Sequence, residues 1–329
     1  MKFSVIIPVY NRPDEVDELL SSLTLQNFSD YEIIIVEDGS KIPCKSVVEK
    51  YAKSIPINYF TKENSGPAET RNFGAKHANG EFLIFFDSDC IIPPEYFAEV
   101  EKEQKDNPVD YFGGPDKSHK TFTPTQKAIS YSMTSFFTTG GIRGGKHSME
   151  QFTPRSFNMG IKASAFQQVG GFSAMRFGED VDLSLRLKEA GFASRLFPNA
   201  YVYHKRRTDF RKFFKQVFNS GLARINLNRL HPGSMKLVHF LPTAFTLGNT
   251  TLLIISPFFP WLLLLPLLYS LLILSHSLLQ GNSIKVALLS IPAAWVQLIG
   301  YGCGFIYSFW QWKVNRKEIK GAFVKNFYK

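Results

Sequence analysis

The first ninety residues alternate between short apolar runs and stretches whose apolar residues recur at helical spacing. The apolar runs predict strands at residues 3–9, 31–36, 57–60 and 82–86. The stretches between them predict helices at residues 14–26, 44–53 and 67–78. Strands that are apolar along their whole length are typical of a parallel sheet that helices cover on both faces. The pattern therefore predicts an α/β domain with a mostly parallel sheet.

The last third of the chain is apolar over a much longer distance. Between Lys236 and Lys313 the only formally charged residue is Lys285. About 20 consecutive apolar residues suffice to cross a bilayer. This stretch therefore predicts a membrane region, and a buried helical hairpin of a soluble protein is the less favoured alternative.

Two membrane-spanning helices, over 252–279 and 286–310, are the arrangement that we expect in this region. Residues 237–251 would then lie at the membrane interface. Three helices are the alternative, because Pro257 and Pro260 could mark a turn between two shorter helices.

The net charge of +10 is concentrated at the end of the chain. Residues 201–329 hold 16 basic and 2 acidic side chains, so the first 200 residues are slightly acidic. This distribution argues against a nucleic-acid-binding protein. The basic residues flank the apolar region on both sides, and the positive-inside rule places both flanks in the cytoplasm. We therefore expect a multi-pass protein of the inner (cytoplasmic) membrane, with an even number of crossings and a cytoplasmic catalytic domain.

The chain thus divides into four predicted parts. Basic and apolar residues alternate from Thr208 to Leu230, which favours an amphipathic helix on an anionic membrane surface. The four parts are a catalytic domain at 1–205, a basic juxtamembrane segment at 206–236, a membrane region at 237–312 and a basic cytoplasmic tail at 313–329.

Polar residues follow three of the predicted strands. Tyr10 comes after the first strand, Asp38 after the second, and Asp87 and Asp89 after the FLIFF strand. Ligands bind beyond the carboxyl ends of parallel strands, so these side chains should converge. Two carboxylates one residue apart are a hard-oxygen site that suits Mg²⁺ or Mn²⁺.

One glycine-rich stretch imitates a nucleotide-binding loop. Residues 140–146 fit the spacing G-x-x-x-x-G-K, but His147 follows where a P-loop needs Ser or Thr. We therefore reject a P-loop here and expect a mobile loop that closes over the donor or the acceptor.

Four ordered motifs in residues 3–205 resemble family 2 glycosyltransferases with the GT-A fold. They are VIIPVYN, IVEDGS, NSGPAETRNFGAKHANGEFLIFFDSD and GEDVDLSLRLKEAGF. The resemblance implies a GT-A (Rossmann-like) domain, a nucleotide-diphospho-sugar donor, a divalent metal and inversion at the anomeric carbon. UDP donors are the commonest in that family.

The resemblance also implies roles for individual residues. It places Pro8 and Tyr10 at the nucleoside, Asp38 at the base or ribose, and Arg71 near the base and phosphates. It assigns Asp87 and Asp89 to the metal and diphosphate, His204 to a third metal or diphosphate ligand, and Asn158 and Gly160 to the donor-sugar and acceptor region. It makes Asp180 the catalytic base and Glu179 its positioning partner.

These roles agree with elementary chemistry. An acceptor hydroxyl is a poor nucleophile and needs a carboxylate to take its proton. The nucleoside diphosphate leaves with additional negative charge, which a metal on two carboxylates stabilises. The sequence supplies separate carboxylate groups, about ninety residues apart, for the two tasks.

Processive members of the family carry a Q-x-x-R-W motif, which this sequence lacks. We therefore expect transfer of a single sugar to a glycan or lipid-linked acceptor, in the assembly of a surface polysaccharide or glycolipid. Polyprenyl phosphate is an alternative acceptor. A membrane-anchored protein that binds nucleotide sugars without turning them over is the alternative from a different functional class.

Overall fold

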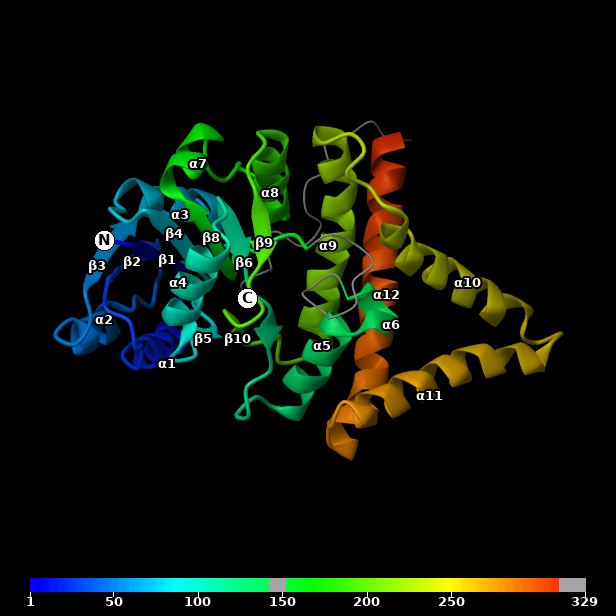
Figure 1. Ribbon diagram of the computed structural model, residues 1–329. Helices are drawn as coiled ribbons and strands as arrows, with labels where there is room; N and C mark the ends of the chain where they lie inside the picture. Colours follow the sequence, from blue (N-terminus) through cyan, green and yellow to red (C-terminus); the bar gives the residue numbers. More distant parts are fainter. Residues whose placement is uncertain (142–151, 314–329) are drawn as a thin grey trace. The chain divides into compact units, whose positions relative to one another are not determined.

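The computed structural model describes residues 1–141 and 152–313 (Figure 1). These residues form two compact units. The N-terminal unit consists of residues 1–119 and 152–205, and the C-terminal unit of residues 120–141 and 206–313. The segment 120–141, which we expected in the catalytic domain, groups with the C-terminal helices. The glycine-rich stretch beyond residue 141 and the predicted basic tail beyond residue 313 lie outside the described residues.

The N-terminal unit alternates strands and helices, as the apolar pattern predicts. Its strands are β1 (Phe3–Val9), β2 (Tyr31–Asp38), β3 (Ile57–Lys62), β4 (Phe82–Phe86), β5 (Cys90–Ile91), β6 (Tyr111–Gly113), β7 (Asp116–Lys117), β8 (Asn158–Lys162), β9 (Ser194–Leu196) and β10 (Val202–His204). Its helices are α1 (Pro13–Leu23), α2 (Lys45–Tyr51), α3 (Pro67–Lys76), α4 (Tyr96–Asp106), α7 (Ala163–Gln168) and α8 (Glu179–Glu189).

Seven strands form one mixed sheet in the order β3-β2-β1-β4-β8-β6-β9. Strands β3, β2, β1 and β4 are parallel to their neighbours, and β6 is parallel to β9. Only β8, among the described strands of this sheet, runs antiparallel to its neighbours. The predicted α/β fold with a mostly parallel sheet is confirmed.

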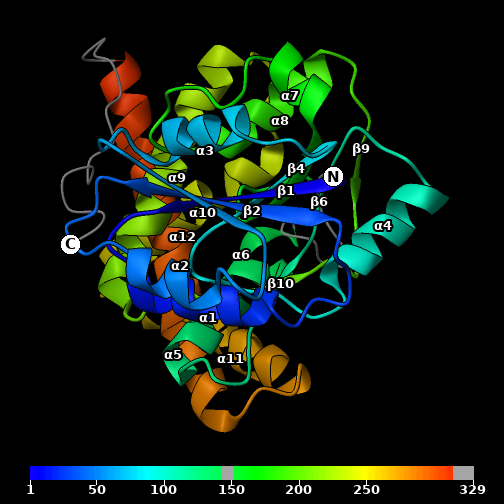
Figure 2. The same ribbon diagram turned by 90° about the vertical axis from the view of Figure 1, so that its left-hand side faces the viewer.

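Helices cover this sheet on both faces (Figure 2). Phe3, Val5 and Ile7 of β1 face a core that includes side chains of α1, α2 and α4, whereas Ile6 faces a core shared with α3, α7 and α8. Strands β2 and β4 alternate in the same way. Both faces are therefore apolar, which explains why these strands read as unbroken apolar runs.

A second sheet extends the first at the end of β4. It has the order β5-β10-β7, and its pairing sets His204 opposite Cys90. Because β5 follows directly after Asp87 and Asp89, this pairing brings the end of the N-terminal unit beside the two carboxylates.

The C-terminal unit is helical. Its elements are α5 (Pro124–Thr134), α6 (Phe136–Thr139), α9 (Phe210–Leu230), η1 (Leu237–His239), α10 (Leu241–Ile255), η2 (Pro260–Leu263), α11 (Leu264–Leu279) and α12 (Ile284–Lys313). The segments Leu237–Ile255, Pro260–Leu279 and Ile284–Lys313 are long and apolar enough to cross a membrane.

The expected amphipathic helix is present as α9, and its apolar face contacts protein. Phe213 and Val217 pack in a cluster with residues of α5 and α12. A Cβ added at Gly304 of α12 would lie 2.0 Å from the Phe218 carbonyl oxygen, so α9 and α12 touch backbone to backbone. Farther along, the Ser308 hydroxyl donates a hydrogen bond to the Leu222 carbonyl. The two helices therefore run side by side over several turns.

The single helix that we expected over 252–279 is divided in two. Helix α10 ends at Ile255, and the next helical turn begins at Pro260. Pro257 and Pro260 cannot donate backbone hydrogen bonds, so an α-helix cannot continue regularly through this segment. The three-helix alternative therefore describes the apolar region, and residues 241–251 are helical as well.

Candidate active site

Loops after β1 and β2 form the first wall of the candidate site. Asn11 has a φ of +54°, and its side-chain oxygen accepts hydrogen bonds from the N–H groups of Lys41 and Ile42. Ser40 in turn accepts a hydrogen bond from the Asn11 N–H. This cross-link compensates a conformation that is uncommon for residues other than glycine. Pro8 and Tyr10, the predicted nucleoside residues, come before Asn11 in the chain. Both are half-buried.

Asp38, the predicted base or ribose ligand, is buried at the end of β2. Lys62 donates a 2.6 Å hydrogen bond to its Oδ1 atom. The N–H groups of Ser65 and Gly66 each donate 2.9 Å hydrogen bonds to the same carboxylate. Asp38 therefore fixes the loop that leads into α3, with both oxygens already engaged.

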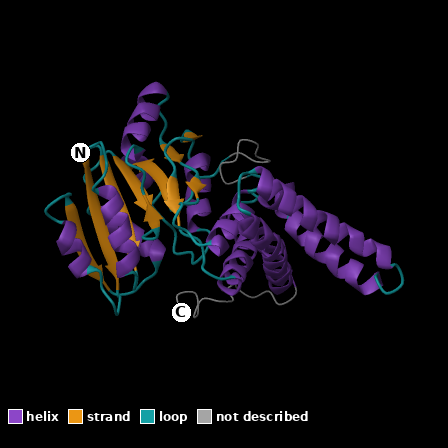
Figure 3. Ribbon diagram, turned by 90° about the horizontal axis from the view of Figure 1, so that it is seen from below, coloured by secondary structure: helices purple, strands orange, loops and turns teal. Residues whose placement is uncertain are grey.

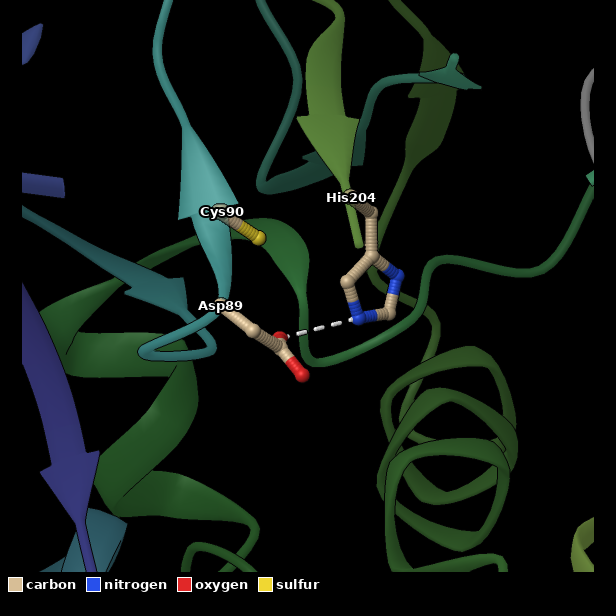
Figure 4. A group of neighbouring side chains, drawn as sticks. All are labelled: Asp89, Cys90 and His204. Atoms are coloured by element: carbon tan, nitrogen blue, oxygen red, sulfur yellow. Dashed lines mark ion pairs between the residues drawn. The ribbon is translucent and has the colours of Figure 1, made fainter. Parts of the chain in front are cut away.

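Asp89 and His204 face each other where β10 runs antiparallel to β5 (Figure 4), and Asp87 lies beside them at the end of β4. The Nε2 atom of His204 lies 3.1 Å from Asp89 Oδ1 and 3.9 Å from Asp87 Oδ2. The ring of His204 stacks on Phe157, which fixes its orientation. Arg12 donates a 2.7 Å hydrogen bond to the other oxygen of Asp89.

Cys90 belongs to the same neighbourhood. Ligand atoms of Asp89, Cys90 and His204 lie within 4.8 Å of one another, which makes this a possible metal site. The Cys90 thiol, however, is 3.6 Å from the Phe157 carbonyl and contacts it as a hydrogen-bond donor. Carboxylate oxygens and an imidazole nitrogen are suitable donors for Mn²⁺, and carboxylates for Mg²⁺, whereas thiols favour softer metals. The carboxylate and imidazole donors at this point therefore fit a divalent cation such as Mn²⁺ or Mg²⁺.

Arg71 links the two acidic motifs. Its guanidinium donates a 2.6 Å hydrogen bond to Asp87 and a 3.2 Å hydrogen bond to Glu179. Arg71 is only 3% exposed, and its guanidinium also lies 5.5 Å from the centre of the Phe172 ring. A buried cation held between two carboxylates keeps both of them in place at little cost in charge repulsion.

Glu179 and Asp180 begin helix α8. Gly178, with a φ of +84°, forms the left-handed turn before the helix, a conformation that glycine adopts without strain. The positive end of the helix dipole favours carboxylates at these positions. Burial raises the pKa of Glu179 to about 7, and the Asp180 carboxylate adds to this, while Arg71 opposes it.

Asp180 has partners different from those of Glu179. Its Oδ1 atom accepts a 2.8 Å hydrogen bond from the Val181 N–H and lies 3.7 Å from a guanidinium nitrogen of Arg155. Asp180 is therefore oriented by its own helix and by one distant ion pair.

Asn158 and Gly160, both on β8, serve the packing of the sheet. Asn158 is fully buried, accepts a 2.6 Å hydrogen bond from the Tyr96 hydroxyl and donates a 2.8 Å bond to the Ala200 carbonyl. A Cβ at Gly160 would lie 2.1 Å from the Phe112 ring. The structure thus assigns both residues structural contacts near the site.

Sequence reasoning missed three cations of this site. Arg12 pairs with Asp89, Lys62 with Asp38, and Arg155 with Asp180. Arg12 carried a usable signal, since it follows β1 at the same sheet edge. Lys62 and Arg155 carried none, because their partners become neighbours only through strand pairing and loop packing.

Comparison with known proteins shows the family of this chain. Residues 4–168 match the model of the family described as Glycosyl transferase family 2. The chain belongs to this family. An uncharacterized glycosyltransferase of Haemophilus influenzae is 34% identical over 192 residues, which cover 56% of this chain and 61% of that protein. The chain therefore spans less than two thirds of the curated relatives that it matches first.

Solved structures share the fold. One is the mannosyltransferase PcManGT from Pyrobaculum calidifontis in complex with GDP-Man and Mn²⁺, with a TM-score of 0.59 at 16% identity. The match covers 94% of this chain and 87% of PcManGT. TarS 1-349 of S. aureus, in complex with UDP-GlcNAc, has a TM-score of 0.50 at 20% identity and covers 74% of this chain and 70% of its own. At these identities the likeness establishes the GT-A fold.

Proposed function

We propose that this protein transfers a single sugar from a nucleotide-diphospho-sugar to a hydroxyl group of a glycan or lipid-linked acceptor. The reaction would invert the anomeric carbon and depend on Mg²⁺ or Mn²⁺. It would take place at the cytoplasmic face of the cell membrane, in the assembly of a surface polysaccharide or glycolipid.

The observation that carries this proposal is the double ion pair of Arg71. It joins Asp87 of the DSD motif to Glu179 of the GED motif, which lie 92 positions apart in the chain. Glycosyl transfer needs one acidic group on the diphosphate side and another beside the acceptor. The bridge supports a single site in which both are available.

Asp180 is the residue that we assign as the base. It must be ionised to accept the proton of the acceptor hydroxyl as the new glycosidic bond forms. The hydrogen bond from the Val181 N–H orients this carboxylate at the start of α8. Glu179 would position Asp180 and Arg71, because it is held in the ion pair with Arg71.

Asp87, Asp89 and His204 are the residues that would hold the cation. A bound Mg²⁺ or Mn²⁺ would supply positive charge against the leaving diphosphate. Arg12 pairs with Asp89 and Arg71 with Asp87, so both cations lie next to the carboxylates that would face the diphosphate. The PcManGT structure contains Mn²⁺ with GDP-Man, and TarS structures contain UDP-GlcNAc or UDP, which supports a metal and a nucleotide-sugar here. We propose a UDP-sugar as the donor.

The apolar helices support an acceptor that is attached to, or reached from, the membrane. Three segments of the described chain are apolar enough to enter a bilayer. A polyprenyl-linked saccharide would present its sugar at the membrane surface, where a catalytic unit on the same chain could reach it.

The test is release of nucleotide from a panel of nucleotide sugars by the full-length protein in detergent. The reaction is run with Mn²⁺ or Mg²⁺ and repeated with EDTA. We expect one donor to be consumed, EDTA to stop the reaction, and Asp89→Asn to abolish it. Asp106→Asn, which changes an exposed carboxylate at the end of α4, is the matched control and should retain full activity.

The outcomes separate the competing functions. Consumption that persists in EDTA would overturn the metal assignment. A donor that stabilises the protein against heat but is not consumed, even with membrane lipid extracts as acceptor, would favour a binding protein. Transfer to polyprenyl phosphate alone would show that this lipid, and not a glycan, is the acceptor.

A further inference from the structure

Helices α10 and α11 form a hairpin whose outer half is exposed or only partly buried. None of residues 247–268 is buried, and none of them is charged. The inner ends contact α12: the Thr246 hydroxyl donates a hydrogen bond to the Leu298 carbonyl, and the indole of Trp295 donates one to the Ser270 hydroxyl. Figures 1 and 3 show the hairpin extending away from the α9–α12 pair.

The tip of this hairpin is apolar and aromatic. Phe258 is 80% exposed and Trp261 is 64% exposed, with Phe259 between them. An apolar surface of this kind on a protein marks a membrane or protein contact. The absence of any charge across the tip favours hydrocarbon as its surroundings over water.

The backbone of the tip suits an environment without water. Pro257 and Pro260 have no N–H group, and the N–H groups of Phe258 and Phe259 both donate to the Ile255 carbonyl. The Ser256 hydroxyl donates to the Leu253 carbonyl. Unpaired polar groups are costly in hydrocarbon, and a turn that pairs its own donors avoids this cost.

The depth of insertion follows from an aromatic cluster at the inner end of the hairpin. Phe245, Tyr269 and Trp295 come from α10, α11 and α12, with ring centres 5.1–5.9 Å apart. Tyr and Trp gather at the boundary between headgroups and hydrocarbon. From Phe245 to Ile255 is ten helical residues, or about 15 Å. That length is half the hydrocarbon thickness of about 30 Å, so it spans one leaflet.

Helix α12 cannot cross the bilayer in the same arrangement, because α9 lies beside it. Lys215 and Arg224 of α9 are nine residues apart, or about 14 Å along the helix. A helix that accompanied α12 through about 30 Å of hydrocarbon would carry at least one of these charges into it. An α9–α12 pair that lies along the membrane surface avoids this cost, because its basic residues then meet the headgroups.

We propose that the α10–α11 hairpin enters only one leaflet and that the protein is anchored without crossing the membrane. Both ends of the hairpin then stay on the same side, where the exposed Lys236 and Lys285 contact anionic headgroups. The occupant of the exposed hairpin surface is the lipid acyl chain. This inference concerns the anchor, so it stands or falls separately from the proposed reaction.

The test measures the depth of single tryptophans in the full-length protein in liposomes. One variant keeps Trp261 and another keeps Trp295, with the other tryptophans changed to Phe. Lipids brominated at different depths of the acyl chain quench the fluorescence. We expect Trp261 to be quenched most by bromines near the bilayer centre and Trp295 by bromines near the headgroups. Strongest quenching of Trp261 near the headgroups, or no binding to liposomes, would overturn the proposal.

A second measurement keeps all the tryptophans in place. Ser256→Cys and, as a control, Lys285→Cys are each combined with Cys303→Ser and exposed to a membrane-impermeant maleimide on either side of sealed vesicles. We expect Cys at position 285 to react from one side and Cys at position 256 to react from neither. Reaction at position 256 from the opposite side would establish a hairpin that crosses the membrane.

Discussion

Arg71 provides the sharpest prediction about how the site is held together. Its guanidinium is buried and pairs with Asp87 at 2.6 Å and Glu179 at 3.2 Å. Arg71→Met keeps the volume of the side chain but leaves two carboxylates without their shared cation. Loss of one partner from a buried ion pair costs about 3–5 kcal/mol. For a unit of this size each kcal/mol corresponds to about 2–4 °C, so we expect the melting temperature to fall by roughly 6–20 °C.

The loss should also depend on pH. The pKa of Glu179 is raised to about 7 although Arg71 opposes the rise, so removal of Arg71 raises it further. Because the folded pKa then lies above the unfolded value, Glu179 destabilises the fold increasingly as pH rises from about 4.5 towards the folded pKa. The fall in melting temperature should therefore be larger at pH 8 than at pH 5.

The assay is thermal melting of the full-length protein in detergent, followed by intrinsic fluorescence. Arg195→Met, which changes an exposed arginine on β9, is the matched control and should melt within about 2 °C of the unchanged protein. Adding Glu179→Gln to Arg71→Met should recover part of the loss. A melting temperature close to that of the control, or a loss equal at both pH values, would refute the buried bridge.

Three further changes test other parts of the structure. Asn158→Leu leaves the Tyr96 hydroxyl without its acceptor and should lower the unfolding free energy by about 1–3 kcal/mol in denaturant titrations; an unchanged midpoint would contradict this. Burial would raise the pKa of Asp110, but a main-chain N–H and Lys162 outweigh it and lower the pKa. Asp110→Asn should therefore lower the melting temperature at pH 7, with a difference that disappears as pH falls below about 4, whereas a difference that persists in acid would oppose the assignment. His204→Ala should weaken Mn²⁺ binding by at least about tenfold in calorimetry, and equal affinity would remove His204 from the cation site.

The apolar pattern predicted the main sheet well because β1, β2 and β4 are buried on both faces. Their side chains report burial directly, whatever their tertiary partners are. The edge strand β9 and the two-residue strands β5 and β7 leave little pattern of that kind, because they are short and paired through contacts distant in sequence. The pattern likewise could not reveal that residues 120–141 pack with the C-terminal helices.

The site was predictable where residues follow a strand and unpredictable where tertiary packing brings them in. Asp87 and Asp89 follow β4, and the structure brings His204 to them through the pairing of β10 with β5. The pairing of Arg155 with Asp180 depends on how the loop before β8 packs against the start of α8. No local pattern encodes such a contact.

The apolar region illustrates the same limit. Hydropathy alone located the apolar segments. The single helix that we expected over 252–279 is interrupted between Ile255 and Pro260, where Pro257 and Pro260 prevent a regular α-helix. The charge pattern predicts only that both ends of the region lie on the same side of a membrane. The number of crossings depends on contacts between helices, above all on the backbone contact of α12 with α9.

The most direct test of the central claim measures binding and turnover of the same nucleotide sugar by Asp180→Asn and the unchanged protein. Calorimetry in Mn²⁺ gives the donor affinity, and release of nucleotide with the acceptor present gives the turnover rate. We predict that Asp180→Asn binds the donor with unchanged affinity and loses at least about a hundredfold in turnover, because a general base contributes on that scale. Turnover by Asp180→Asn at the rate of the unchanged protein would contradict the assignment of this site as a glycosyltransferase centre with Asp180 as its base.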